Sequence, residues 1–222
     1  MIIGIAQREG TGGPIAVAAA TYTSTSTGMT AAALVDGMGH GAEIVRLAPM
    51  LAETTARVGA ARGAMAGILS AGLLLADPGE PDAVGVCAVS LPTGGAEVAW
   101  AGDSAAWHWD GEHLERLTTD ATLAAYLSRA AGEDIPVHAL ADYVGITLGR
   151  AIPATVRYVS VPAGGHRLLT TDGIHDQMPP GAIESLAHKH SSDPQALADA
   201  LVAAARPDAD GYRDDASAVV VS

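Results

Sequence analysis

The sequence predicts an α+β fold in which two antiparallel β-sheets pack together and helices cover them. Apolar runs of strand length follow one another in the middle of the chain, between residues 82 and 117. Typical hairpin turn sequences, PTGG and WDGE, separate several of these runs. Helical patterns occur mainly before and after this region, and such segregation favours α+β over an alternating βαβ arrangement.

The N-terminal part is expected to form a hairpin followed by a helical tract. Strand-like runs cover residues 15–23 and 29–35, and the small polar turn STSTG joins them. A helical tract extends from about residue 42 to residue 76, and we expect Pro49 to kink or split it, because proline removes a helix hydrogen bond. The stretch DPGEPD, residues 77–82, predicts a turn into the next strand.

The rest of the chain adds mostly strands, and two helices. The predicted strands are 82–91, 96–103, 105–111, 112–117, 154–161, 166–173 and 216–222. A helix is predicted for residues 122–132. A second helix is predicted for residues 191–205, with Ser192 or Asp193 as its N-cap and Pro194 in its first turn.

Length and composition are those of one soluble domain covering residues 1–222, with 49% hydrophobic and 17% charged residues. The net charge of −13 argues against nucleic acid or an anionic membrane as a partner. Cys87 is the only cysteine, so no internal disulfide forms, and its apolar surroundings predict a core residue. The first residues lack a signal-peptide pattern and no apolar run is long enough to span a bilayer, so we expect a cytoplasmic protein.

Aspartates lie at four predicted strand ends: Asp36, Asp103 and Asp172 end strands, and Asp214 with Asp215 precedes the last one. Taken singly, each is typical of a turn. Taken together, carboxylates at the ends of neighbouring strands can converge at one rim of a sheet. Oxygen ligands of this kind suit a hard cation such as Mg²⁺ or Mn²⁺. Such a cation would also be needed if this acidic protein handled phosphate.

A dinucleotide site is the alternative for the stretch VDGMGHGAE. Gly37, Gly39 and Ala42 match the pattern G-x-G-x-x-A between a strand and a helix. That pattern also requires a second parallel strand soon after the helix, with an acidic residue about 20 positions on. Here the helical tract continues instead, and Asp36 stands where a pyrophosphate would approach.

The segments VDGMGHG, AGDSAAWHWDGEHLERLTTD, LLTTDGIHD and RDDASAVVV resemble, in this order, the motifs of the metal-dependent PPM (PP2C-type) serine/threonine phosphatases. The resemblance extends from about residue 31 to the C-terminus. It is nearest to bacterial members, including those that dephosphorylate anti-sigma-factor antagonists. It implies a four-layer sandwich of two antiparallel sheets flanked by helix pairs, and a phosphorylated protein as substrate.

The resemblance also implies roles for the aspartates. Asp36 would bridge two metal ions, and the carbonyl of Gly37 would bind one of them. Asp172 and Asp214 would complete the shell of the first ion. Asp103 would share a third ion with Asp172. One to three Mg²⁺ or Mn²⁺ ions would then activate a water molecule that hydrolyses phosphoserine or phosphothreonine without a covalent intermediate.

The chain departs from the family pattern in its N-terminal segment, where the family has an Arg and then the acids of an Asn-Glu-Asp motif. Pro14 and Ile15 stand about where the acids are expected, and an apolar side chain cannot bind a metal ion. Arg8 and Glu9 lie slightly earlier. They are candidates to substitute, with Arg8 binding phosphate, or else Arg8 is a solvated surface residue.

Other differences affect single side chains. Met38 replaces the proton-donating histidine of eukaryotic members, and nearby His40 is the candidate donor to the leaving oxygen, with packing at a helix start as the alternative. Asp215 replaces the usual Asn. Because adjacent strand residues face opposite sides, Asp214 alone is expected to be the ligand. His175 is expected to be structural.

Residues 122–149 match the flap that lies beside the active site in the family and varies between members. Two functions follow from these observations. The chain is either an active metal-dependent phosphatase, or a degenerate family member that binds a phosphoprotein or signalling partner without turnover. The surviving aspartates favour the first function, and the missing N-terminal acids favour the second.

Overall fold

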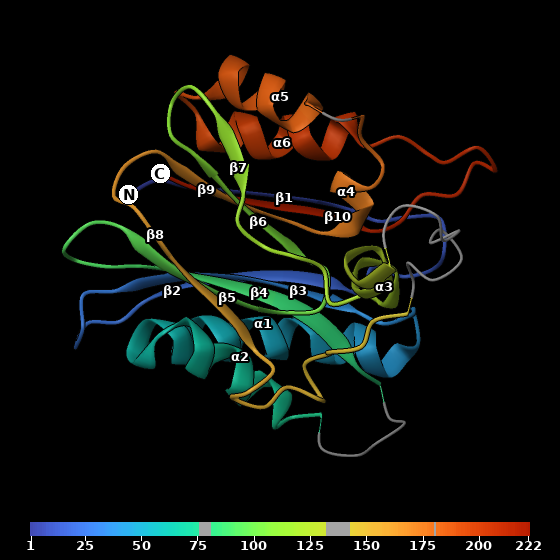
Figure 1. Cartoon of the computed structure of the whole chain (residues 1–222), viewed down its shortest axis with the longest axis horizontal. Coiled ribbons are helices and arrows are strands. Elements are labelled where there is room, and N and C mark those ends of the chain that lie inside the picture. Colours follow the sequence, from blue (N-terminus) through green and yellow to red (C-terminus); the bar gives the residue numbers. More distant parts are fainter. Residues whose placement is uncertain (76–80, 132–142, 180) are drawn as a thin grey trace.

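The computed structural model describes residues 1–75, 81–131, 143–179 and 181–222, and two five-stranded sheets form its centre (Figure 1). In spatial order, the first sheet consists of β1 (Ile3–Arg8), β10 (Ala216–Val221), β9 (His166–Thr170), β6 (Ala105–Trp109) and β7 (Leu114–Arg116). The second sheet consists of β2 (Val17–Thr23), β3 (Thr30–Gly37), β4 (Ala83–Ser90), β5 (Ala96–Ala101) and β8 (Arg157–Val161). All neighbouring strands are antiparallel, as the sequence predicts.

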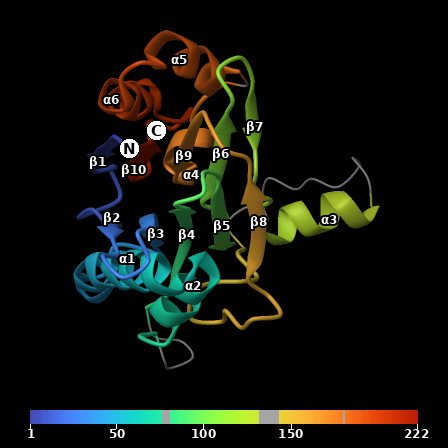
Figure 2. The same ribbon diagram turned by 90° about the vertical axis from the view of Figure 1, so that its left-hand side faces the viewer.

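Helices cover both outer faces of this sandwich. The pair α1 (Ala42–Arg62) and α2 (Ala64–Gly72) lies against the second sheet, and α5 (Ala182–His190) and α6 (Pro194–Ala204) lie over the first. The short α4 (Asp172–His175) follows β9 directly. The remaining helix, α3 (Leu123–Ala131), projects from the side of the sandwich (Figure 2). The predicted α+β sandwich with flanking helix pairs is therefore confirmed.

Three apolar cores hold the four layers together. One lies between the sheets and includes Leu34, Leu169 and Val219. The other two separate each sheet from its helices, one around Leu51 of α1 and one around Leu201 of α6. Because both faces of each sheet are covered, every residue of the central strand β4 is buried. The sandwich leaves only the strand ends and their loops for polar chemistry.

The helical tract differs from the prediction in where it breaks. Pro49 does not split α1, which continues to Arg62 and ends before Gly63, a residue with a φ of 97°. Pro49 lies on the exposed face of α1, so water can bind the carbonyl that loses its helix partner. Gly63 then gives the chain a conformation that other residues rarely adopt, and α2 begins.

Other elements were missed or placed inexactly. The strand β1 and the helix α5 were not predicted from the sequence. The strand predicted for residues 166–173 ends at Thr170, and α4 starts at Asp172. The C-terminal helix is confirmed: Asp193 is its N-cap and accepts hydrogen bonds from the backbone N–H groups of Gln195 and Ala196.

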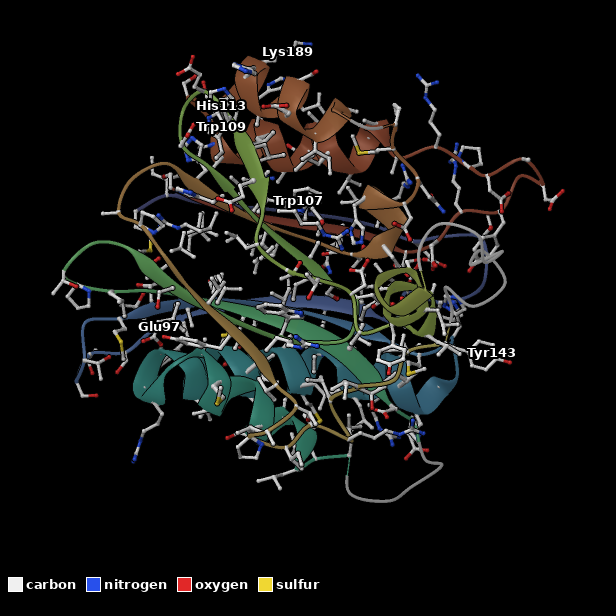
Figure 3. All side chains as sticks on the ribbon, viewed as in Figure 1. Glu97, Trp107, Trp109, His113, Tyr143 and Lys189 are labelled. Carbon is white, nitrogen blue, oxygen red and sulfur yellow. The ribbon has the colours of Figure 1, made fainter. Side chains whose placement is uncertain are left out.

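Part of the predicted flap is also described. Thr122 and Val144 form a β-bridge at its base, α3 lies in its first part, and residues 132–142 are outside the described part of the chain. Tyr143 points outwards beside α3 (Figure 3). Within the described ranges, no helix has both the length and the apolar character needed to cross a membrane.

Candidate active site

An open cavity of about 720 Å³ lies at one end of the sandwich, beside α3. The ends of β3 and β9, the β5–β6 connection and the loop before β10 all contribute to its wall. Among its described lining residues none is a lysine or an arginine, and seven are aspartates, namely Asp36, Asp103, Asp120, Asp172, Asp176, Asp214 and Asp215. The lining is therefore strongly acidic.

The predicted site residues reach this cavity from both sheets. Asp36 is near the end of β3 in the second sheet. Asp172 follows β9, and Asp214 precedes β10, both in the first sheet. Asp103 lies in the connection where the chain crosses from β5 in the second sheet to β6 in the first. His40 and Gly37 line the same cavity, so the structure brings all six predicted residues together.

Two glycines next to these aspartates allow the chain segments to approach closely. A Cβ atom on Gly37 would lie 2.3 Å from a side-chain carbon of Ile44, at the start of α1. A Cβ atom on Gly173 would lie 2.3 Å from the carbonyl oxygen of Asp215. Asp-Gly at these two positions is thus required by packing around the cavity and not only by turn formation.

The clustered carboxylates perturb one another's protonation. Burial, followed by the negative charges of Asp172 and Asp214, raises the pKa of Asp36 well above its usual value. Burial raises the pKa of Asp172 to about 8, and Asp103 and Asp214 add to the effect. Burial also raises the pKa of Asp103 to about 6. Since each of these charges is disfavoured, a bound cation would relieve the repulsion.

The donor chemistry of the cavity fits Mg²⁺ or Mn²⁺, because these hard cations prefer carboxylate oxygens. The geometry is not that of a finished site. Among the described residues, no group of three or more His, Cys, Asp or Glu side chains is arranged so that it could hold a metal ion. Asp36, Asp172 and Asp214 are the residues that would hold the ions, and binding would have to draw their carboxylates together.

The two neighbouring aspartates before β10 have different partners. One carboxylate oxygen of Asp215 accepts a hydrogen bond from the N–H of Gly10 and the other from the N–H of Ala16, both at 2.7 Å. Asp215 is 1% exposed. Both of its oxygens are therefore used to hold the β1–β2 connection, whereas the carboxylate of Asp214 accepts a local hydrogen bond from the N–H of Asp215.

His40 lies under the same connection. Its Nδ1 is 3.2 Å from the carbonyl oxygen of Pro14 and 3.9 Å from a carboxylate oxygen of Asp215. Since a carbonyl oxygen only accepts hydrogen bonds, Nδ1 is the nitrogen that donates. A Cβ atom on Gly12 would lie 2.5 Å from Nε2 of the ring. His40 thus combines a packing role with a position in the cavity wall.

The β1–β2 connection supplies no acidic or cationic side chain to the cavity, as far as the described lining residues show. Its two strands belong to different sheets. The guanidinium of Arg8 donates a hydrogen bond of 2.7 Å from Nη1 to the carbonyl oxygen of Val202, near the end of α6. Arg8 is thus partly buried against α6, and neither Arg8 nor Glu9 is among the described lining residues of the cavity.

A network in and behind the cavity wall holds His175. Trp107, which is labelled in Figure 3, donates from its indole N–H to Thr170 Oγ1 at 3.0 Å. Thr170 Oγ1 shares a hydrogen bond of 3.1 Å with Nδ1 of His175. Arg116 lies over the Trp107 ring and pairs with Asp120. Burial, together with the nearby Arg116, lowers the pKa of His175 to about 3, so the ring is neutral at physiological pH.

Sequence reasoning missed two groups of lining residues. Asp120 and Asp176 lie within the quoted motifs but had no expected role as part of the acidic wall. Tyr212 also lines the cavity. An isolated tyrosine in a polar loop gives no periodic or motif signal, so only the fold shows where its side chain lies.

The comparisons with known proteins agree on the fold. The chain matches MsPP, a PPM Ser-Thr phosphatase from Mycobacterium smegmatis solved with cacodylate, at a TM-score of 0.78 and 22% identity, over 100% of this chain and 98% of that one. A serine/threonine phosphatase of S. agalactiae matches at a TM-score of 0.81 and 14% identity, over 99% and 98% of the two chains.

A third match is the phosphatase PstP/Ppp of Mycobacterium tuberculosis, with a TM-score of 0.75 and 16% identity over 99% of this chain and 97% of that one. No protein-family model matches the sequence, and no curated protein matches it either. The chain therefore has the fold of the bacterial PPM serine/threonine phosphatases, as the resemblance of its motifs implied.

Proposed function

We propose that this protein is a Mg²⁺- or Mn²⁺-dependent phosphatase that hydrolyses phosphoserine and phosphothreonine in proteins. The proposal proceeds from the PPM fold and is carried by one observation. Asp36, Asp172 and Asp214 come from two different sheets and meet in a single acidic cavity. Mutual repulsion of this kind destabilises the fold unless a cation is present, so a scaffold without metal would gain nothing from it.

An anionic substrate can enter this cavity only when bound cations reverse the negative electrostatic potential of the cavity. Phosphate carries negative charge, and the described lining offers aspartates without lysine or arginine. When bound, divalent ions lower the pKa of a water molecule and neutralise charge on the phosphoryl oxygens. The PPM fold supports a phosphorylated protein as the class of substrate.

The residues would divide the work as follows. Asp36 would hold ions from the second sheet, with the carbonyl of Gly37 beside it, and Asp172 and Asp214 would hold them from the first. Asp103, placed at the crossing between the sheets, would share a further ion with Asp172. Asp36 lies at the end of β3, and the other three carboxylates lie within two residues of a strand of the packed sandwich, which limits how far each can move.

His40 would donate the proton that the leaving seryl or threonyl oxygen needs. Its Nδ1 is directed to the carbonyl of Pro14, so Nε2 is the nitrogen left for the proton transfer. No other described residue of the lining combines a histidine ring with a position beside Asp36 in the chain.

Phosphoprotein binding without turnover is the second candidate. It is favoured by the β1–β2 connection, which brings no carboxylate to the described lining, and by the lack of a finished metal site among the described residues. Under this proposal the same cavity would bind a phosphorylated partner, for example a kinase target or an anti-sigma-factor antagonist, in the cytoplasm.

Hydrolysis of an aryl phosphate and of phosphoserine and phosphothreonine peptides, with Mn²⁺ or with EDTA, separates the two functions. We expect turnover in Mn²⁺ that EDTA abolishes and that Asp172→Asn reduces by at least about 10²-fold. Asp199→Asn, a change at an exposed aspartate on α6, is the matched control and should leave turnover intact.

Two results would count against the phosphatase. Tight binding of phosphopeptides without any turnover in Mg²⁺ or Mn²⁺ would favour the second candidate. Turnover that persists in EDTA, or that Asp172→Asn leaves unchanged, would mean that the acidic cavity is not the site of hydrolysis.

A further inference from the structure

The described lining of the acidic cavity offers no lysine or arginine side chain to bind phosphoryl oxygens. Arg8, the arginine that the sequence offered for this role, donates to the carbonyl of Val202 at 2.7 Å instead. Arg8 itself is not among the described lining residues. Metal ions alone would leave some phosphoryl oxygens without a donor, so an uncharged donor in the wall is of interest.

Tyr212 provides such a donor. Its side chain lines the cavity, and its hydroxyl oxygen lies 3.3 Å from the position that a Cβ atom on Gly12 would take. The hydroxyl also interacts with the carboxylate of Asp214. The phenol therefore reaches across the mouth of the cavity, from the loop before β10 towards the β1–β2 connection.

The loop that carries Tyr212 is held in place by its own hydrogen bonds. One carboxylate oxygen of Asp208 accepts from the N–H of Asp210 at 2.9 Å and from the N–H of Tyr212 at 2.8 Å. The N–H of Asp208 donates to the carbonyl of Tyr212 at 2.8 Å. These bonds fix the backbone of Tyr212, so its side chain is presented to the cavity by a closed turn.

We infer that Tyr212 binds the substrate by donating its hydroxyl proton in a hydrogen bond to a phosphoryl oxygen. The inference rests on the proposed phosphatase or phosphoprotein-binding function. With cations bound, the carboxylate of Asp214 would hold an ion, and the Tyr212 hydroxyl would then be available to a phosphoryl oxygen.

Tyr212→Phe tests this inference, because it keeps the ring and removes only the donor. The side chain is 42% exposed, so the change should leave the melting temperature nearly unaffected. In Mn²⁺ we expect KM for an aryl phosphate and the inhibition constant of inorganic phosphate to rise about tenfold each, with kcat nearly unchanged. The rise in melting temperature caused by Mn²⁺ should stay the same, since the metal ligands are intact.

Tyr158→Phe is the matched control, because Tyr158 is similarly exposed but lies on the edge strand β8. It should change none of these constants. Calorimetric titration of the wild type and Tyr212→Phe with inorganic phosphate in Mn²⁺ gives a readout that does not need turnover. Weaker binding by Tyr212→Phe supports the inference even if the protein proves to be a binder without catalysis.

Two outcomes overturn the inference in distinguishable ways. Equal phosphate binding and equal KM in the wild type and Tyr212→Phe would show that Tyr212 does not contact the phosphoryl group, and would leave the proposed function standing. A wild-type protein that neither binds phosphate nor hydrolyses its esters in Mn²⁺ would refute the proposed function, and this inference with it.

Discussion

Folding raises the pKa values of three carboxyl groups in the cavity, those of Asp36, Asp103 and Asp172. Asp172 shows this best, because burial and neighbouring aspartates raise its pKa from the ordinary value of 3.8 to about 8. In the unfolded chain the proton leaves near the ordinary value, whereas the folded protein retains it to higher pH. The metal-free protein must therefore lose stability as pH rises through this interval.

This effect can be measured without interference from His175, whose pKa is about 3 in the folded state and whose ordinary value is 6.5, so that it acts only below that pH. In EDTA, the free energy of unfolding from urea denaturation should fall between pH 6.5 and 8, by about 2 kcal/mol from Asp172 and further from Asp36, whose pKa is also raised. Asp172→Asn should show a smaller fall, while Asp199→Asn should match the wild type. A stability that rises over this interval would contradict the assigned pKa direction.

Arg8 makes a second prediction at the residue scale. Its guanidinium caps a carbonyl near the end of α6, where a positive charge is favourable. Arg8→Met keeps much of the apolar stem and removes the hydrogen bond, so the protein should lose about 1–2 kcal/mol of stability in urea. KM for an aryl phosphate should not change. A large rise in KM would instead indicate that Arg8 binds the phosphoryl group of the substrate.

At the scale of elements, the β1–β2 connection depends on Asp215. Both oxygens of its carboxylate accept backbone N–H groups, from Gly10 and Ala16. In Asp215→Asn one oxygen becomes an NH₂ group, which cannot accept, so one of these donors loses its partner. We expect a loss of about 1–2 kcal/mol in the free energy of unfolding, measured by urea denaturation. An unchanged stability would mean that the connection is not held by this side chain.

The contact between β1 and α6 provides another test of an element. A Cβ atom on Gly4 would lie 2.2 Å from the backbone oxygen of Pro194, a contact that no side chain can relieve. Gly4→Ala should therefore push α6 away from the sheet and destabilise the protein by about 1–3 kcal/mol, as seen in thermal or urea unfolding. Gly111→Ser is the comparison variant without a steric clash, because nothing lies within 4 Å of the added Cβ atom. Its φ of 109° still adds local strain.

At the scale of the whole molecule, the candidate site joins the two sheets. Asp36 belongs to the second sheet, and Asp172 and Asp214 adjoin strands of the first. A cation bound by all three would link the layers and stabilise only the folded state. Mn²⁺ at about 100 times its dissociation constant should add about 2.7 kcal/mol, seen as a higher melting temperature.

The matched variant is Asp36→Ala, in which the melting temperature should not respond to Mn²⁺. Mn²⁺ should also stabilise the native chain more at pH 8 than at pH 6, because protons compete for the same carboxylates. An equal response of native chain and variant would show that the metal binds elsewhere, and that the three aspartates do not act together.

The sequence predicted those features that depend on neighbouring residues. Turn sequences identified the β2–β3, β4–β5 and β6–β7 hairpins, and Asp193 with Pro194 marked the start of α6. The strand β1 escaped prediction, because its short sequence with Gly4 has no clear alternation and its main partner, β10, lies at the other end of the chain. The sequence did not show that α1 continues past Pro49, because the exposure of Pro49 depends on which face of the helix meets the sheet.

The sequence by itself determined that aspartates stand at strand ends, since that pattern is local, and their motifs indicated the fold that the comparisons confirm. The tertiary structure alone decided which side chains share the cavity. In the folded chain Arg8 binds a carbonyl of α6, and both carboxylate oxygens of Asp215 accept backbone N–H groups of the β1–β2 connection. Tyr212 lines the cavity. These outcomes depend on contacts between segments up to about 200 positions apart, and such contacts are set by how the two sheets pack.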